Sequence, residues 1–162
     1  WHRDYLETLY PQNKLVEKGG INVAGTPIDI STIATPAYIQ AGREDHIAPP
    51  ESVWRLTELF RGPLRFVLAG SGHIAGVVNP PAKKRRSYWV ADALEHQSQP
   101  LPGDPNTWFS QAVEHPGSWW PDWTSWLADH SGKQIKARTK AGNAKYRPIE
   151  PAPGRYVKVR AA

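Results

Sequence analysis

The sequence predicts an α/β fold in which parallel strands are joined by helical crossovers. Residues 36–41 and 64–69 are short, mostly apolar runs that each end at a glycine, as buried strands do. Between them, residues 49–60 place apolar side chains at helical spacing behind a pair of prolines. A strand–helix–strand unit of this length implies parallel neighbours in an open sheet, with ligands beyond the carboxyl ends of the strands.

The elements before this unit are shorter. Residues 1–10 predict an amphipathic helix that Pro11 ends, and the Gly19-Gly20 pair predicts a turn. Residues 21–30 predict an irregular, strand-like segment. We therefore place the start of the main sheet after residue 30.

The elements after this unit are interrupted by proline. Residues 79–81 prevent a long helix after the second strand. An aspartate and a proline at the start of 104–113 are typical of an N-cap and a first turn, and predict a helix over that range. A second helix, with most of its tryptophans on one face, is predicted from Pro121. Beyond His130 the sequence is rich in Lys, Gly, Arg and Pro, which is typical of an extended tail.

Composition limits the classes of partner. The chain has 162 residues, a formal net charge of +5, eight tryptophans, sixteen prolines and no cysteine. The positive charge favours an anionic partner such as nucleic acid, a membrane surface or a phosphate-bearing small molecule. Without cysteine these residues form no disulfide and no thiolate metal site. No apolar stretch approaches the roughly 20 residues that span a bilayer, so we expect no transmembrane segment.

Two polar clusters follow the two predicted strands. Arg43-Glu44-Asp45-His46 comes after the first and Ser71-Gly72-His73 after the second. An acid after one strand and a histidine after the next is how the last two members of a catalytic triad occur in α/β-hydrolase folds. A carboxylate on one imidazole nitrogen fixes the tautomer and stabilises the imidazolium, so Asp45 and His73 are candidate catalytic residues. On spacing alone, Asp45 could equally cap the next helix and His73 could be an ordinary loop histidine.

A triad also needs a nucleophile. No cysteine is present, and the histidine and its acid conventionally follow the nucleophile in the chain. We therefore expect this chain to be the C-terminal part of an α/β-hydrolase fold whose nucleophile-bearing half is missing.

Two other interpretations of these clusters are weaker. Gly70 to Ala75 satisfies the dinucleotide pattern G-x-G-x-x-A, but Pro80-Pro81 interrupts the helix that this motif requires. Glu44 to His46 are all ligating types, yet adjacent side chains diverge and no further ligand lies at helical spacing. We expect neither a dinucleotide site nor a metal site.

A basic run follows the second cluster. Lys83-Lys84-Arg85-Arg86 places four positive charges in a row, with Tyr88 and Trp89 close behind. Such a run is most often a solvated loop. It could also bind the phosphates of a nucleotide-bearing ligand, with the aromatic residues stacking on a base.

Several strings closely resemble the class I polyhydroxyalkanoate synthases, and the resemblance covers essentially the whole chain. The strings are REDHIAP at 43–49, RFVL at 65–68, SGHIAGVVNPPAK at 71–83, HPGSWWPDW at 115–123 and EPAPGRYVK at 150–158.

The resemblance implies a cytoplasmic, granule-associated acyltransferase that polymerises (R)-3-hydroxyacyl-CoA into polyhydroxyalkanoate and releases CoA. Asp45 and His73 match the family's catalytic aspartate and histidine, whereas its cysteine nucleophile lies upstream and is absent here. Acyl-CoA is the substrate, so we expect no cofactor and no metal, and the phosphates of CoA are candidate ligands for Lys83, Lys84, Arg85 and Arg86.

The resemblance also implies partners and an organisation. The partners are the growing polyester, the granule surface and a second copy of the full-length chain, with no nucleic acid. Residues 1–30 would return from a cap region into the core, 31–130 would form the C-terminal part of the catalytic core, and 131–162 would be a basic Pro/Gly-rich tail. We expect this chain to be inactive by itself.

Two further functions remain open. One is an α/β-hydrolase-fold thioesterase or polyester depolymerase, which would pass the acyl group to water. The other is a non-catalytic granule-binding module built around the tryptophans. A serine nucleophile upstream would favour the former, and granule association that survives loss of Asp45 and His73 would favour the latter.

Overall fold

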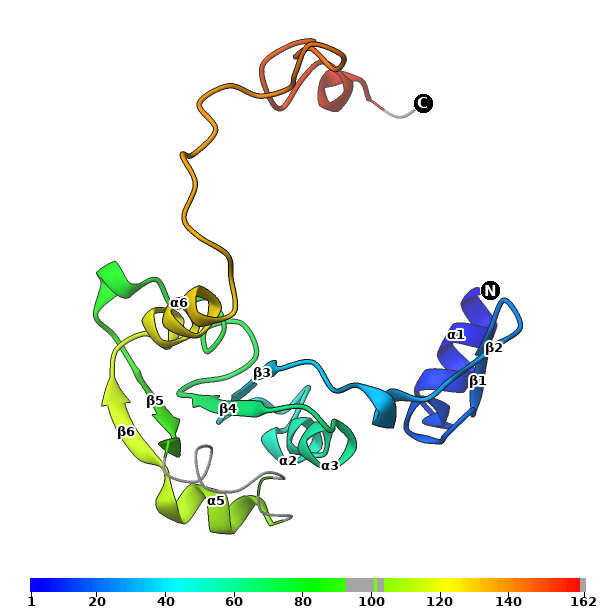
Figure 1. The fold of residues 1–162 in the computed structure, drawn as a ribbon, viewed down its shortest axis with the longest axis vertical. Helices are drawn as coiled ribbons and strands as arrows, with labels where there is room; N and C mark the ends of the chain where they lie inside the picture. Colours follow the sequence, from blue (N-terminus) through cyan, green and yellow to red (C-terminus); the bar gives the residue numbers. More distant parts are fainter. Residues whose placement is uncertain (93–100, 102–103, 161–162) are drawn as a thin grey trace. The chain divides into compact units, whose positions relative to one another are not determined.

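The computed structural model describes residues 1–92, 101 and 104–160, and the chain divides into two compact units (Figure 1). The first unit is Trp1–His130 and the second begins at Ser131. Among its described residues, the second unit contains one 3-10 turn, Tyr156–Lys158, as its regular structure. No helix within the described ranges is long and apolar enough to cross a membrane.

The first unit begins with a helix and a hairpin. Helix α1 (His2–Leu9) ends before Pro11 as predicted, and a 3-10 turn (Lys14–Val16) follows. Strands β1 (Ile21–Val23) and β2 (Thr26–Ile28) then pair antiparallel, so the predicted strand-like segment is a two-stranded hairpin.

The main sheet has four strands in the order β3-β4-β5-β6. Their bounds are Ala37–Gly42 for β3, Leu64–Ala69 for β4, Ser87–Val90 for β5 and Val113–Pro116 for β6. The first two strands pair parallel in the predicted manner, with the last residue of each, Gly42 and Ala69, opposite one another. The α/β class is therefore confirmed.

The sequence predicts parallel strands joined by helical crossovers and does not predict β5 or β6; these two strands pair antiparallel, so the sheet is mixed. No regular helix longer than the 3-10 turn Pro81–Lys83 lies between β4 and β5. A parallel connection normally needs a helical crossover, and Pro80-Pro81 prevents one here.

Two predicted helices differ in detail. The helix over 104–113 ends earlier, because α5 is Pro105–Gln111 and Val113 starts β6 opposite Val90. Pairing with β5 provides hydrogen bonds that a further helical turn would otherwise supply, and β-branched valine suits a strand. The crossover helix is split into α2 (Pro50–Trp54) and α3 (Leu56–Leu59), although the backbone between them stays helical.

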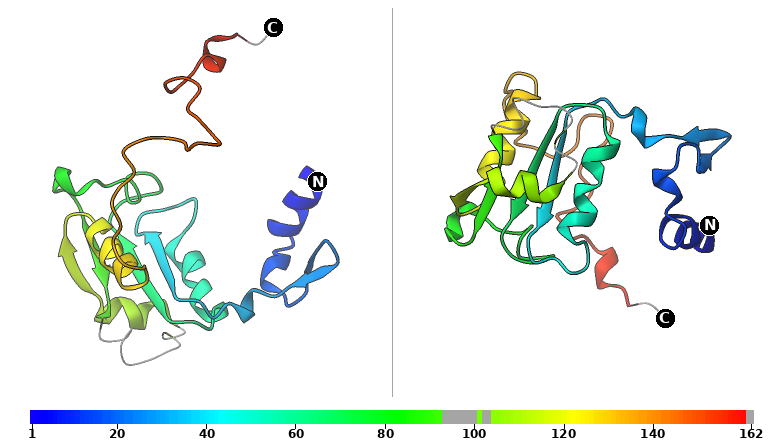
Figure 2. Two further views of the ribbon diagram at one scale, coloured as in Figure 1. Left: turned by 45° about the horizontal axis from the view of Figure 1, so that its top comes forward. Right: turned by 90° about the horizontal axis from the view of Figure 1, so that it is seen from below.

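The sheet is covered on both faces. Helices α2 and α3 lie on one face and α6 (Trp120–Asp129) lies on the other (Figure 2). Alternate residues of β4 face opposite ways, so Phe66 packs with the α2 side and Val67 with the α6 side. A strand buried on both faces is mostly apolar, which is why β4 was recognisable in the sequence.

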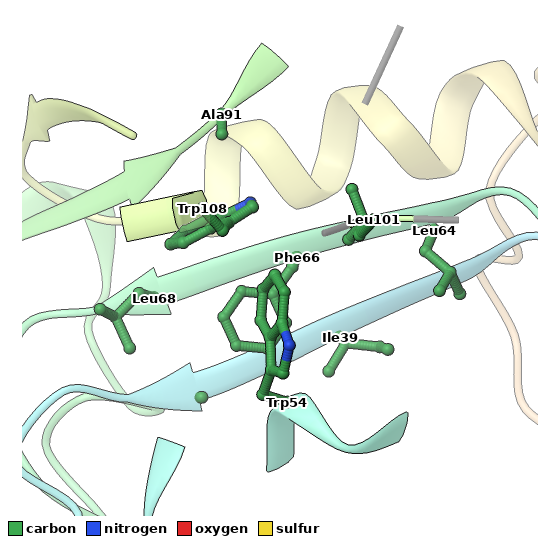
Figure 3. Packing of buried hydrophobic residues seen from close by; sticks show 9 residues of the cluster. Ile39, Trp54, Leu64, Phe66, Leu68, Ala91, Leu101 and Trp108 are labelled. Carbon is green, nitrogen blue, oxygen red and sulfur yellow. The ribbon is translucent and has the colours of Figure 1, made fainter. Parts of the chain in front are cut away.

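Three aromatic rings form the centre of the larger core cluster (Figure 3). The ring centroids of Trp54 and Phe66 are 4.8 Å apart, those of Phe66 and Trp108 are 5.0 Å apart, and both pairs meet edge to face. Aromatic contacts of this geometry add to the burial of large apolar surfaces. Helices α2 and α5 are thereby joined to β4.

Replacing Trp108 by alanine should lower the free energy of unfolding by about 3–5 kcal/mol, because a buried ring is lost and a cavity remains. Urea unfolding followed by far-UV circular dichroism measures this. Trp123→Ala is the control, since the Trp123 side chain lies on α6 and is 39% exposed, and it should cost about 1 kcal/mol or less. Equal losses for the two variants would contradict the placement of the core.

Candidate active site

Residues 43–48, here called the acid turn, follow β3 directly and fix the position of the Asp45 side chain. One carboxylate oxygen, Oδ1, accepts hydrogen bonds from the backbone N–H groups of Ile47 and Ala48, each at 2.9 Å. The residue is 8% exposed. The carboxylate therefore stabilises its own turn, much as a helix cap would, while helix α2 begins only at Pro50.

Residues 70–77, here called the histidine turn, follow β4 and bring the His73 side chain into contact with the Asp45 carboxylate. The Nδ1 atom of His73 lies 2.8 Å from the second oxygen of Asp45, Oδ2. The His73 side chain is 50% exposed, in contrast to its buried partner. Two residues that are 28 positions apart in the chain thus form one acid–imidazole pair.

Backbone hydrogen bonds join the two turns. The N–H of Arg43 donates to the carbonyl of Ala69 at 2.8 Å, and the N–H of Glu44 donates to the carbonyl of Ser71 at 3.2 Å. A Cβ on Gly42 would lie 3.1 Å from the Ser71 oxygen and 3.2 Å from the Asp45 Cβ. Glycine at this strand end therefore lets the two turns approach closely, a role that sequence alone did not reveal.

Hydrogen bonding lowers the pKa of the acid and so favours its ionised form. The backbone N–H of Ala48 is the largest cause holding the pKa of Asp45 below its ordinary value, with further contributions from His73 and the N–H of Ile47. An ionised Asp45 accepts a hydrogen bond from the Nδ1–H group of His73. In the neutral ring the lone pair is then on Nε2. Such a ring can take a proton from a substrate or a nucleophile.

The Arg43 side chain packs on two aromatic rings and does not join the acid–imidazole pair. Its guanidinium lies over the rings of Trp89 and Phe109, with centroids 4.7 and 5.3 Å away. It borders a pocket of about 390 Å³ that is also lined by Trp54 and Trp108 but by neither Asp45 nor His73. The first residue of the predicted polar cluster therefore packs against the α5 side, and the structure does not bring it to the imidazole.

The basic run lies on the loop that leads from the histidine turn to β5. The side chains of Lys83, Lys84, Arg85 and Arg86 are all exposed. Their backbone is nevertheless held, because the carbonyl of Arg86 accepts from the N–H of Gly117 at 2.7 Å. In the part of the chain that the structure describes, no group of three His, Cys, Asp or Glu residues could hold a metal ion.

The pKa of Asp45 should rise only in part when His73 is replaced by alanine, because the N–H of Ala48 remains in place. Carboxyl ¹³C NMR titration of the chain measures it. Asp104, whose pKa is lowered chiefly by the N–H of Asn106, is the control and should not change. A return of Asp45 to the usual value of about 3.9 would contradict this assignment. Because the folded pKa is lowered, the stabilisation from Asp45 is complete above that value and is lost as pH falls through the folded pKa.

The chain was compared with protein families and with curated relatives. No family model matches it. It is 51% identical over 161 residues to the poly(3-hydroxyalkanoate) polymerase subunit PhaC of Cupriavidus necator, which is 99% of this chain and 26% of that protein. It is 43% identical over 156 residues to the PhaC subunit of Rhizobium etli, and 40% identical over 159 residues to poly(3-hydroxyalkanoate) polymerase 2 of Ectopseudomonas oleovorans.

These matches run along almost the whole chain. They cover 96% and 98% of it in the Rhizobium and Ectopseudomonas proteins, and 23% and 27% of those proteins. The chain thus spans about a quarter of the length of the relatives it matches. At such identity along almost the whole of its length, the chain matches a quarter-length segment of the poly(3-hydroxyalkanoate) polymerases.

Proposed function

We propose that this chain supplies the acid and the base of a cysteine-dependent polymerase that transfers 3-hydroxyacyl groups from CoA to a growing polyester. Asp45 is the acid and His73 is the base. The protein would work as a homodimer at the surface of a cytoplasmic polyester granule. Acyl-CoA is the substrate in this proposal, which includes no cofactor and no metal.

The observation that carries the proposal is the contact between His73 Nδ1 and Asp45 Oδ2 at 2.8 Å. It lies at the adjacent carboxyl ends of two parallel strands, where open α/β sheets bind ligands. A buried, ionised acid behind a half-exposed imidazole is the arrangement that a general base needs. The names of the relatives supply the reaction class.

The edge of the sheet supports an α/β-hydrolase core that continues beyond this chain. Strand β3 is at one end of the sheet order, yet Ile39 and Ala41 on it are buried. The side-chain nitrogen Nε2 of Gln40 is also buried and has no hydrogen-bond partner among the described residues. Apolar strands of this kind are usually interior strands, so we propose that a further strand from the nucleophile-bearing part pairs with β3.

Thioester exchange is the chemistry that fits these residues. His73 would take the proton of a cysteine thiol at Nε2, the resulting thiolate would attack the acyl-CoA carbonyl, and His73 would return the proton to the departing CoA sulfur. The neutral His73 would next remove the proton of a 3-hydroxyl group. The oxygen of that group would attack the bound acyl carbonyl to form an ester, and the displaced cysteine sulfur would take the proton back from His73. Asp45 would stabilise the imidazolium at each step. None of the 162 residues is a cysteine, so the proposal requires the nucleophile from outside this chain.

The basic run would attract the substrate. CoA carries several phosphate charges, and Lys83, Lys84, Arg85 and Arg86 expose four positive charges on the loop that also carries His73. Long-range attraction of this kind raises the local concentration of an anionic substrate and weakens as salt is added.

The proposed catalytic roles are tested in the Cupriavidus necator polymerase with its matching segment replaced by this chain, here called the chimera. The chimera should polymerise 3-hydroxybutyryl-CoA. Asp45→Ala and His73→Ala should each lower kcat by at least about 100-fold, the usual contribution of general acid–base catalysis. CoA release and polymer yield are the measurements.

His130→Ala is the matched control, because His130 is an exposed histidine at the end of α6 and should leave kcat unchanged. The chain alone should release no CoA. A chimera that folds but makes no polymer, or a His73→Ala variant with normal kcat, would contradict the proposed function.

The role of the basic run is tested by replacing all four residues with serine in the chimera. The KM for hydroxybutyryl-CoA should rise by about tenfold at low salt, and its salt dependence should flatten, because screened attraction is lost. The control removes four exposed positive charges from the second unit, at Lys133, Lys136, Arg138 and Lys140. The same KM change in both variants would mean that net charge alone, not this loop, attracts the substrate.

A further inference from the structure

Two tryptophan side chains hold the far end of the histidine turn. The indole N–H of Trp119 donates to the carbonyl of Gly76 at 2.9 Å, and that of Trp120 donates to the carbonyl of Val77 at 3.0 Å. The N–H of Gly76 also donates back to the carbonyl of Gly72 at 2.9 Å. The turn that carries His73 is thereby closed on itself and fastened to the start of α6.

The attachment at Gly76 leaves little freedom. A Cβ there would lie 2.9 Å from the Gly72 oxygen and 3.1 Å from the Ser71 oxygen, so the turn is tightly wound. Trp119 is 9% exposed and its hydrogen bond is buried. A buried carbonyl that loses the indole donor is costly to leave unpaired, so we expect removal of the indole N–H to shift the turn toward another partner.

Asp122 determines where α6 lies. Its Oδ2 accepts from the hydroxyl of Tyr38 at 2.8 Å and from Nε of Arg65 at 2.8 Å, and its Oδ1 is paired with Nη2 of Arg65. Tyr38 and Arg65 are register partners on β3 and β4. The helix is therefore docked onto the same two strands whose ends carry Asp45 and His73.

The docking continues directly to the indole. The ring of Tyr38 stacks on that of Trp119, with centroids 6.0 Å apart and an interplanar angle of 29°. The carboxylate of Asp122 lies in the first turn of α6, where the helix dipole favours negative charge. Its side chain is 13% exposed, so the ion pair with Arg65 is largely shielded from water.

We propose that Trp119 is a positioning residue for His73, and that Asp122 places Trp119 by docking α6 on β3 and β4. The inference rests on the proposed function, in which His73 is the base. The start of the histidine turn is held by the acid turn, through the N–H of Glu44 on the carbonyl of Ser71. Trp119 holds its end, so the imidazole is fixed between two attachments.

Trp119→Phe in the chimera tests the proposal, because phenylalanine keeps a ring against Tyr38 and removes the N–H donor. We expect kcat to fall by about tenfold or more, since a catalytic group displaced by about 1 Å can cost 100-fold. The KM for hydroxybutyryl-CoA should stay within about twofold, because a positioning loss acts on the chemical step. A wild-type kcat would overturn the inference.

Trp123→Phe is the matched control. Trp123 is on the same helix, its ring contacts that of Trp119 at 5.9 Å, and its indole donates no hydrogen bond to any described residue. It should retain wild-type kcat. Equal losses in Trp119→Phe and Trp123→Phe would overturn the inference, because the ring size and not the N–H would then matter.

A double variant tests whether Asp122 and Trp119 act on kcat through the same turn. Asp122→Asn removes the ion pair with Arg65, and its kcat loss should not add to that of Trp119→Phe if both act through the same turn. Additive losses would contradict the placement of Trp119 by Asp122. If Trp119→Phe does not fold, Asp122→Asn alone should lower kcat, because it loosens the docking of α6 that places Trp119, and a wild-type kcat there would overturn the proposal.

A spectroscopic measurement separates positioning from general destabilisation. The Nδ1 proton of His73, shared with Asp45, should give a downfield ¹H resonance in the 162-residue chain. Trp119→Phe should weaken or remove it while Trp123→Phe retains it, and an unchanged resonance in Trp119→Phe would contradict the inference.

The kinetic outcomes separate failure of this inference from failure of the proposed function. If His73→Ala leaves polymerisation intact, the proposed function fails. If His73→Ala abolishes polymerisation while Trp119→Phe behaves as wild type, the positioning role alone fails.

Discussion

The parallel register of β3 and β4 is the constraint on which the site depends. Gly42 and Ala69 lie opposite one another, so the acid turn and the histidine turn leave the sheet at the same level. A slip of one residue would displace one turn by about 3.3 Å and send its strand's side chains to the opposite face. The hydrogen bond between Asp45 and His73 would then be too long to form. Register, more than either side chain, makes the pair possible.

That register is itself maintained by burial on two faces. Phe66 points to the aromatic cluster with Trp54 and Trp108, and Val67 points to the α6 side with Trp119. A one-residue slip would exchange the side chains of the two faces, so Phe66 would point to the α6 side and Val67 to the aromatic cluster, and the packing of both clusters would be lost. The core and the site are therefore stabilised by the same strand.

The α6 face differs from the aromatic face because it contains a shielded ion pair. Asp122 and Arg65 form a shielded ion pair, and the Tyr38 hydroxyl completes the hydrogen bonding of the carboxylate. Burying these charges has a desolvation cost, so a pair of this kind is weak evidence for stability. It does favour the observed position of α6, because the carboxylate accepts hydrogen bonds from Tyr38 and Arg65 there. Burial raises the pKa of Tyr38, and the hydrogen bond to Asp122 raises it further, so the hydroxyl keeps its proton and donates a hydrogen bond to the carboxylate.

The sequence by itself determined β3, β4, the turns that follow them and the candidate pair, since these follow from local patterns: two apolar runs ending at glycine, a helix between them, and polar residues after each run. It did not predict β5, β6 or their antiparallel pairing, because strand pairing is made by residues distant in the chain. The hydrogen bonds of Trp119 and Asp122 were equally hidden, as an indole in an aromatic-rich segment predicts only packing. Tertiary structure decided which carbonyl that indole binds, because only the docking of α6 across β3 and β4 brings it to the turn of His73.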